Sequence, residues 1–433
     1  MDQAQEEVGV IVLGAGLAGL TAAAEAARRD SDVVVLDVRS PGGRARSDER
    51  DRYIFNQGPH AVYRQGPGAA ILADLGLHPR GALPATTVAG WKDHRLGLLP
   101  TSATSLIRSP FVGWRSKAQL GRLLVTFPRL ESGTLAEMSA AAWVRSLGLR
   151  DDAASVLSTL IRVATYAPDL EAIAADAAVR QLQLVQTGGV SYLHGGWTEL
   201  VKGLVEATTK SGGRMATEER AVNVAQAHTG DPSASWEVRT SARTWVSRAV
   251  IIATGSPAAA RSLLPFDPDW SLGADATAAC LDLGLRHPPA NLAVFGIDQP
   301  LYLSTHAPSA KLAPKGAALV HVMRYGARSS ESDRAELWEF AQGAGIRKED
   351  VVVERFLHRM VVTHSLPVPG IGLTGRPPVA VGGHPGLFIA GDWVGPIGLL
   401  ADAAIASGQA AGQAAAAVSN GPSLPIVDER RAG

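Results

Sequence analysis

The chain has 433 residues, of which 46% are hydrophobic and 19% charged, and its formal net charge is zero. This length is sufficient for two domains with large cores. The balanced charge argues against nucleic acid as the main partner, because no basic excess exists to collect phosphates. The only cysteine, Cys280, excludes an intrachain disulfide and fits a reducing compartment. With no signal-peptide pattern and no apolar run of roughly 18 residues, we expect a cytoplasmic protein.

The stretch 8–39 predicts a strand, a glycine turn, a helix and a second strand. Gly14, Gly16 and Gly19 complete the pattern G-x-G-x-x-G. These glycines permit the turn, the approach of a pyrophosphate and close helix–strand packing, and Asp37 follows where a ribose hydroxyl needs an acceptor. The helix N-terminus offers free N–H groups to the phosphates. The residues predicted to bind a dinucleotide here are Gly14, Ala15, Gly16, Leu17, Ala18, Gly19, Asp37, Val38 and Arg39. This pattern alone leaves NAD and FAD open.

The segment that follows favours FAD. Residues 41–47 read PGGRARS and resemble the G-G-R-x-x-[ST] signature of the FAD-linked amine oxidase and phytoene desaturase superfamily. Gly42 and Gly43 allow the loop to fold back over the dinucleotide, and Arg44 can supply a charged fork to its phosphates. The resemblance implies FAD held noncovalently, because Cys280 lies away from the C-terminal motif that carries the cysteine of the covalent branch. Attachment through His60 is the alternative.

The resemblance also implies an architecture. We expect an α/β (α+β) protein with a Rossmann-like FAD-binding domain in a three-layer ββα arrangement. A discontinuous substrate domain of mixed sheet and helices should complete it. The expected FAD-binding segments are 1–80, 188–262 and 356–433, and the expected substrate or cap segments are 81–187 and 263–355.

Several polar residues are candidates for the active site. In the resembling family a turn like that of Gly58 and Pro59 lies against the isoalloxazine ring, and His60 follows it. His60 is interpreted either as an active-site residue or as a hydrogen-bonded loop histidine. Tyr192 and His194 lie in a paired-glycine segment, 188–200, and either face the substrate cavity or pack at the domain junction. One further candidate, Arg359, could anchor an acidic or carbonyl-bearing substrate.

The C-terminal motif is a β run that ends at Gly391 and Asp392 and leads into an Ala-rich helix. By resemblance, Asp392 binds the ribityl and pyrophosphate region, and backbone N–H groups of Leu399 and Leu400 reach the flavin N1/C2=O edge. The helix dipole would stabilise an anionic reduced flavin. Trp393 either walls the substrate side or packs in the core. The resemblance also places a valine near the adenine, which here is Val222.

Residues 94–130 contain six Arg or Lys residues and no Asp or Glu, interleaved with apolar residues. A basic amphipathic stretch can rest on an anionic membrane surface. The other interpretation is a cap helix whose basic face is merely solvated. Pro110 favours this second interpretation, because it interrupts any long interfacial helix.

Together these patterns predict an FAD-dependent oxidoreductase, a desaturase or oxidase. It would move a hydride from a C–H bond of a lipophilic small molecule, such as an isoprenoid or other secondary metabolite, to flavin N5. Electrons would then pass to oxygen or another acceptor, and no metal is expected. The alternatives are a flavin amine oxidase, a flavin-dependent isomerase, and a non-catalytic escort related to the prenyl-GTPase dissociation inhibitors. The motifs say little about the substrate.

Overall fold

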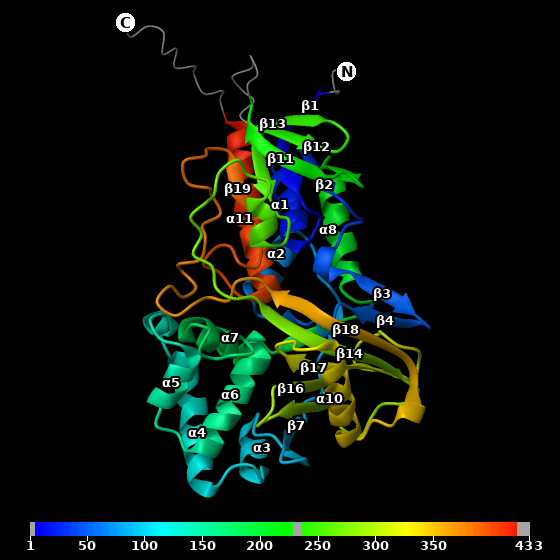
Figure 1. Cartoon of the computed structure of the whole chain (residues 1–433), viewed down its shortest axis with the longest axis vertical. Coiled ribbons are helices and arrows are strands. Elements are labelled where there is room, and N and C mark those ends of the chain that lie inside the picture. The colour runs from blue at the N-terminus through cyan, green and yellow to red at the C-terminus, as the bar shows by residue number, and fades with distance from the viewer. Residues whose placement is uncertain (1–4, 228–235, 422–433) are drawn as a thin grey trace, which may run out of the picture.

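The computed structural model describes residues 5–227 and 236–421, which form two seven-stranded sheets and a group of helices (Figure 1). The first sheet lies in the upper half of Figure 1. The second sheet and the helices α3 to α7 lie in the lower half.

The first sheet has a parallel core that is buried on both faces. Its strands are β1 (Gln5–Leu13), β2 (Val33–Asp37), β10 (Arg214–Thr217), β11 (Ala221–Gln226), β12 (Trp236–Thr240), β13 (Thr244–Ile252) and β19 (Leu387–Ile389). The path runs β10-β2-β1-β13-β12-β11, with β19 paired to β13; the pairs β11–β12 and β12–β13 are antiparallel and the other pairs are parallel. Burial on both faces explains the nearly continuous apolar runs of β1 and β2.

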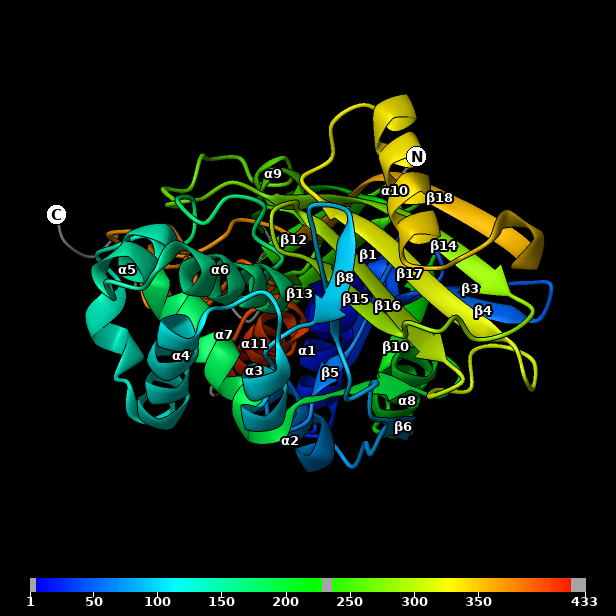
Figure 2. The ribbon, with the colours of Figure 1, turned by 90° about the horizontal axis from the view of Figure 1, so that it is seen from below.

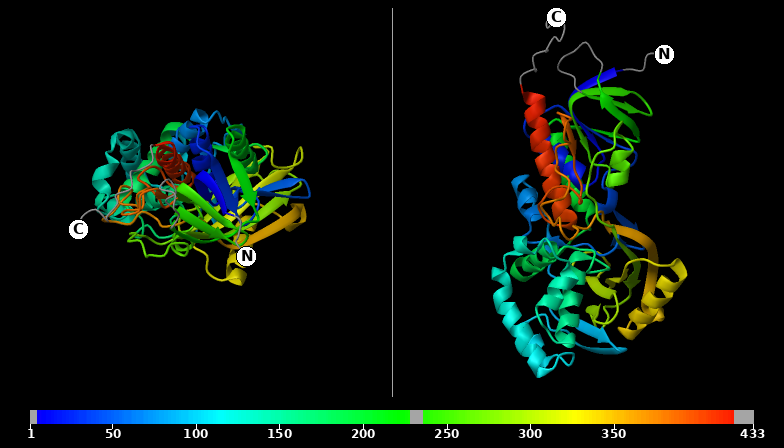
Figure 3. Two further views of the ribbon diagram at one scale, coloured as in Figure 1. Left: turned by 90° about the horizontal axis from the view of Figure 1, so that it is seen from above. Right: turned by 60° about the vertical axis from the view of Figure 1, so that its left-hand side comes forward.

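Helices α1 (Leu17–Ala27), α8 (Thr198–Lys210) and α11 (Leu400–Asn420) pack on one face of this sheet (Figure 3). Small residues let α1 and α11 approach closely. A Cβ added to Gly408 would lie 2.3 Å from the carbonyl oxygen of Ala18, and one on Gly412 would lie 2.4 Å from that of Ala22. The small side chains of both Ala-rich helices therefore allow this close contact. The contact holds the N-terminus of α11 near that of α1.

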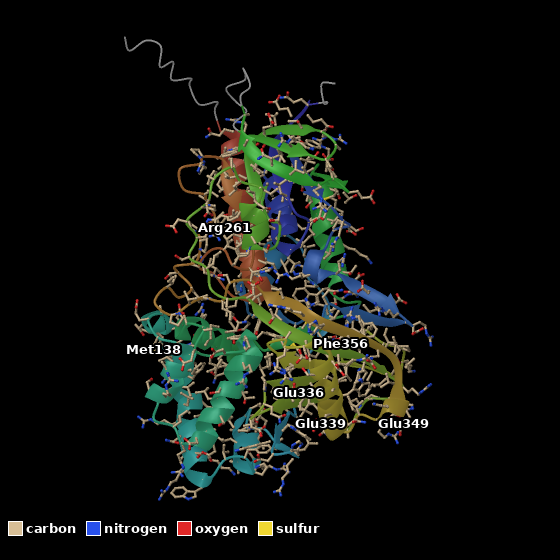
Figure 4. The ribbon with its side chains drawn as sticks, viewed as in Figure 1. Met138, Arg261, Glu336, Glu339, Glu349 and Phe356 are labelled. Carbon is tan, nitrogen blue, oxygen red and sulfur yellow. The ribbon has the colours of Figure 1, made fainter. Side chains whose placement is uncertain are left out.

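The second sheet has one aliphatic face and one buried face that carries polar side chains. Its order is β18 (Val351–Thr363), β14 (Ala276–Leu285), β17 (Ala318–Tyr325), β16 (Leu301–Ala307), β15 (Ala293–Gly296), β7 (Ala89–Lys92) and β8 (Arg95–Leu98). Helix α10 (Ser330–Gly343), on which Figure 4 labels Glu336 and Glu339, packs its apolar side against one face of the sheet. The opposite face carries aromatic and polar side chains, as the two-residue period of a strand allows.

The remaining helices pack together as one group beside the second sheet (Figure 2). They are α3 (Ala103–Arg108), α4 (Trp114–Thr126), α5 (Ala140–Ser146), α6 (Asp151–Thr165) and α7 (Ala175–Gly188). Smaller elements complete the described chain: β3 (Ser47–Arg50), β4 (Tyr53–Asn56), β5 (Val62–Tyr63), α2 (Pro67–Asp74), β6 (Gly81–Ala82), β9 (Val190–Leu193) and α9 (Pro257–Arg261). Within the described ranges, no helix combines the length and the apolar character that crossing a membrane requires.

The predicted mixed α/β architecture is confirmed, with two large sheets in the expected roles. One expected boundary falls inside a structural element. Strand β18 continues through position 356 and pairs with β14 on both sides of it, so the whole strand belongs to the second sheet. The exact domain limits remain predictions.

Candidate functional site

A cavity of about 1390 Å³ runs from the glycine turn after β1 to the helices α4, α6 and α7. Residues from both sheets and from the helical group line it. One end is built from the dinucleotide motifs and the other from apolar side chains, so a cofactor and a substrate can meet inside it.

The glycine turn leaves room for a phosphate. Gly14 has φ +107°, and a Cβ on Gly19 would lie 1.8 Å from the carbonyl oxygen of Gly14, so both positions require glycine. In contrast, a Cβ on Gly16 would meet nothing within 4 Å. Gly16 precedes α1, whose N-terminus has no side-chain cap. The open space and free N–H groups form an anion site.

Asp37 is fixed beside this turn. Its carboxylate accepts hydrogen bonds from the N–H of Ala15 at 2.7 Å and from that of Arg39 at 2.8 Å. The predicted residues that line the cavity at this end are Gly14, Gly16, Leu17, Ala18, Asp37, Val38, Arg39, Gly42, Gly43 and Arg44. Ala15 and Gly19 are not part of the wall and support the turn from behind.

The terminal motif meets the G-G-R loop through an ion pair. Arg44 Nη2 lies 2.9 Å from Asp392 Oδ2, which also accepts the N–H of His364 at 3.1 Å. Asp392 is 3% exposed, and its Oδ1 has no hydrogen-bond partner among the described residues. A buried carboxylate oxygen left without a donor is costly. It therefore marks the place of a hydroxyl or another donor from a bound molecule.

Helix α11 points its N-terminus into the same space. Leu400, its first residue, has φ +56° and lines the cavity, while the side chain of Leu399 is buried in the core beside the helical group. No side chain caps this helix. In its first turn, Asp402 lines the cavity and accepts the N–H of Gly68 at 3.2 Å. Burial raises the pKa of Asp402 to about 7.

The turn at Gly58 and Pro59 and the histidine that follows it lie at the cavity. Gly58 has φ +80°, and Pro59 and His60 are in the cavity wall. His60 Nδ1 lies 3.1 Å from the carbonyl oxygen of Gly58, and burial lowers the pKa of His60 to about 4. In the neutral imidazole, the other ring nitrogen, Nε2, stays available for a hydrogen bond with a neighbouring group. Tyr192 is also in the wall.

Eight predicted site residues lie outside the cavity wall: Ala15, Gly19 and Leu399, described above, and Gly58, Val222, Trp393, His194 and Arg359. Val222 is 44% exposed, and a β-bulge between Ala221 and Asn223 shifts the register, so Ala221 lines the cavity in its place. Trp393 is buried behind the first sheet, with its ring 4.8 Å from that of Trp270. The expectation for Val222 is corrected, whereas Trp393 follows the core-packing alternative.

His194 and Arg359 also point elsewhere. His194 Nδ1 accepts the N–H of Lys311 at 3.2 Å in a loop after β9. Arg359 is exposed on β18, because alternation along a strand turns it away from its neighbour Met360, which lines the cavity. Neither residue contacts the space where a substrate would lie.

The other end of the cavity is apolar with a small polar group. Helices α4, α6 and α7 contribute Leu120, Leu123, Leu124, Val156, Leu157, Leu160, Val163, Leu182 and Val185. Sequence reasoning missed Tyr63, Tyr166, Trp197, Tyr302 and Ser304, which also line it. The alternation of Tyr302 and Ser304 along β16 is a signal that could have indicated a shared face.

Comparison with known proteins gives the class. Residues 17–416 match the family described as flavin containing amine oxidoreductase, so the chain belongs to this family. No curated protein matches the sequence significantly.

Solved structures show the same fold at low identity. An oxidoreductase from Methanosarcina mazei is similar with a TM-score of 0.77 and 16% identity, over 94% of this chain and 100% of that one. A putrescine oxidase bound to putrescine is similar with a TM-score of 0.72 and 16% identity, over 95% of this chain and 99% of that one. A Rab GDI from Plasmodium falciparum is similar with a TM-score of 0.64 and 11% identity, over 97% of this chain and 100% of that one.

The cofactor is FAD, as the family implies. The residues present fit it: the space at Gly16, the acceptor Asp37, the cation Arg44 and the unsatisfied Oδ1 of Asp392 each match a part of a dinucleotide. The protein is thus an FAD-dependent oxidoreductase by family.

Proposed function

We propose that the protein holds FAD noncovalently and oxidises a neutral, lipophilic small molecule at a C–H bond. Bound FAD supplies a hydride acceptor, and the protein supplies orientation and exclusion of water. The observation that carries this proposal is the substrate end of the cavity, where α4, α6 and α7 present aliphatic side chains with Gln186 as the one polar residue from these helices, and Phe127 closes the wall nearby. Such a surface favours apolar ligands.

Amine oxidation is the second candidate, favoured by the family and by the putrescine oxidase fold. The family commonly uses a flavin-facing lysine, and no lysine is in the cavity wall within the described ranges. Asp402 offers an acid in the wall, but burial raises its pKa to about 7 and reduces its value as an anchor for a cation. An escort function is disfavoured by the retained cradle around Gly16 and Asp392.

A panel of reductants tests the proposal. The holoenzyme is mixed anaerobically with lipophilic alcohols and polyenes in one series and with primary amines and diamines in another, and bleaching of the flavin band is followed. The proposal expects bleaching by members of the first series, and reoxidation by oxygen or an artificial acceptor. Bleaching by amines alone would contradict it. Conversion of a compound without bleaching would indicate an isomerase.

A further inference from the structure

Four strands of the second sheet place one polar residue each in the same row. Ser304 of β16 pairs with His321 of β17, His321 pairs with Asp282 of β14, and Asp282 pairs with Arg355 of β18. Direct cross-strand partners point to the same face, with Cβ atoms about 4.5–5.5 Å apart. The row therefore crosses the sheet from the cavity wall, where Ser304 lies, to Asp48 near the surface.

The middle of the row is strongly bonded and fully buried. His321 Nδ1 lies 2.6 Å from Asp282 Oδ1, and Arg355 Nε donates to Asp282 Oδ2 at 2.9 Å. Cys280 Sγ lies 3.1 Å from the same Oδ1. Cys280, Asp282 and His321 lie within metal-ligand distance of one another, but these donors already satisfy the carboxylate. The group is therefore a hydrogen-bond network.

The end of the row that faces the cavity is open. Nδ1 of His321 is engaged by Asp282, and Nε2 has no partner among the described residues. Ser304 Oγ neighbours the hydroxyls of Tyr192 and Tyr302 but completes no hydrogen bond in the described chain. Ser304 and His321 are direct cross-strand partners, so this hydroxyl and this ring nitrogen lie on one face of the sheet, although no hydrogen bond joins them.

The contacts show where a positive charge would be balanced. Asp282 and Asp48 offer two carboxylates to the single guanidinium of Arg355, so a further positive charge beside Asp282 would have a partner. Burial opposes ionisation of Asp282, but His321 and Arg355 hold its pKa below its ordinary value. Cys280 stays a thiol because burial raises its pKa well above the usual range.

The other histidines nearby are poor competitors for this proton. The ring of His306 stacks on Tyr192 at 3.6 Å and lies edge-on to His321 at 4.4 Å. Burial, and then His321, lower the pKa of His306 well below its ordinary value, and burial lowers that of His60 to about 4. Asp282 contacts neither ring, whereas it bonds directly to His321.

We propose that Ser304, His321 and Asp282 form a proton relay that receives the hydroxyl proton of the substrate, which makes the substrate an alcohol. The proposal rests on the proposed function. Bound FAD would accept the hydride of the C–H bond, while the O–H proton would pass to Ser304 Oγ and the Ser304 hydroxyl, turned toward its cross-strand partner, would give its own proton to His321 Nε2. A C=O bond forms, and the protonated imidazole is balanced by Asp282. Ser304 touches the substrate, while Asp282 is a positioning residue.

A chromogenic phenol tests the relay without knowledge of the substrate. The holoenzyme is titrated with 4-nitrophenol at a pH where the free phenol is mostly protonated, and the visible absorbance of its phenolate is recorded. The relay predicts that the bound phenol ionises. Ser304→Ala, His321→Gln and Asp282→Asn should each give about tenfold less phenolate per bound phenol. The control Thr305→Val changes the next residue on the same strand, which points to the opposite face.

Phenol that binds in neutral form to the unchanged protein, or variants that keep the phenolate, would overturn the relay. A second measurement does not depend on the phenol or on FAD. In ¹⁵N-histidine-labelled apoprotein, the relay predicts a low-field Nδ1 proton for His321 that Asp282→Asn removes, and an Nε2 signal that gains a proton as the pH is lowered from 9 to 5. An Nε2 that never titrates would overturn the relay, even if FAD binding and oxidase activity are confirmed.

Discussion

Arg44 and Asp392 form an ion pair of 2.9 Å that joins the G-G-R loop near the start of the chain to the flavin motif near its end. The pair is asymmetric: Asp392 is buried, whereas the Arg44 side chain is 40% exposed and faces the cavity. The arginine can therefore engage a phosphate while it stays paired with the buried carboxylate. The loop and the terminal helix are thus held in one cofactor site.

Asp392→Asn should weaken FAD binding more than it weakens the fold. The variant removes the charge that pairs with Arg44 and one acceptor for the cofactor, and we expect FAD affinity to fall by about 10- to 100-fold, or ~1.4–2.7 kcal/mol. Fluorescence titration of the apoprotein with FAD measures this loss. Arg359→Gln is the matched control, because Arg359 is exposed and outside the cavity, and its affinity should not change. Equal losses in both variants would refute this assignment.

Two alanine substitutions in one turn should separate cofactor binding from folding. Gly16→Ala meets no protein atom and has an ordinary φ of −80°, so the apoprotein should keep its Tm. Its Cβ would occupy the pyrophosphate space, and FAD affinity should fall by about tenfold or more. Gly19→Ala would place a Cβ 1.8 Å from a carbonyl oxygen and should destabilise the apoprotein itself. Thermal unfolding and FAD titration of both variants measure the two effects. A Gly19→Ala apoprotein that is as stable as the unchanged protein would contradict the close packing at Gly19.

Asp402 should make the apoprotein less stable as the pH rises. Burial raises the pKa of this carboxyl from 3.8 to about 7 in the folded state. The stabilisation is complete below about pH 4 and is lost as the pH rises through 7, since the folded state binds the proton more tightly. Asp402→Asn should flatten this dependence and gain on the order of 2 kcal/mol above pH 7. Unfolding in urea at pH 5 and pH 8 measures it; an unchanged pH profile would contradict the assignment.

The basic stretch 94–130 presents an exposed apolar surface. Ile107, Trp114 and Val125 are 73%, 76% and 71% exposed, and Arg115 lies over the ring of Trp114 at 5.1 Å. Helix α4 lines the cavity with its opposite side, through Leu120 and neighbouring leucines. We therefore expect weak binding to anionic vesicles that high salt reverses.

Cosedimentation with phosphatidylserine-containing vesicles measures this binding. Trp114→Ala should reduce the bound fraction several-fold, and neutral vesicles should bind little protein. The substitution Val352→Ala is the control, because Val352 is an exposed apolar residue outside the stretch, on β18. Binding that is insensitive to both lipid charge and Trp114 would favour the solvated-cap interpretation.

The parts of the site that could be predicted from sequence are those built from residues that lie close together along the chain. Gly14, Gly16 and Arg44 belong to short motifs whose turn geometry is local, and the structure places them together at one end of the cavity, with Gly19 packed behind the turn. Val222 was wrong because one bulge changes which residue of β11 points inward. No local pattern indicates such a bulge.

The row from Ser304 to Arg355 could not be predicted for a different reason. Its residues come from four strands, and their alignment depends on the register of three strand pairs. Trp393 shows the same limit on a smaller scale: its neighbour Asp392 faces the cavity, and only the fold decides that the indole packs against Trp270.

The most direct test of the central claim is the visible spectrum of the purified protein before and after denaturation and filtration. The account predicts a flavin band that passes the filter as free FAD, or that appears after the apoprotein is reconstituted with FAD. A flavin retained with the denatured protein would contradict noncovalent binding and indicate attachment, with His60 the first residue to change. No flavin after reconstitution would contradict the assignment of this cavity to FAD.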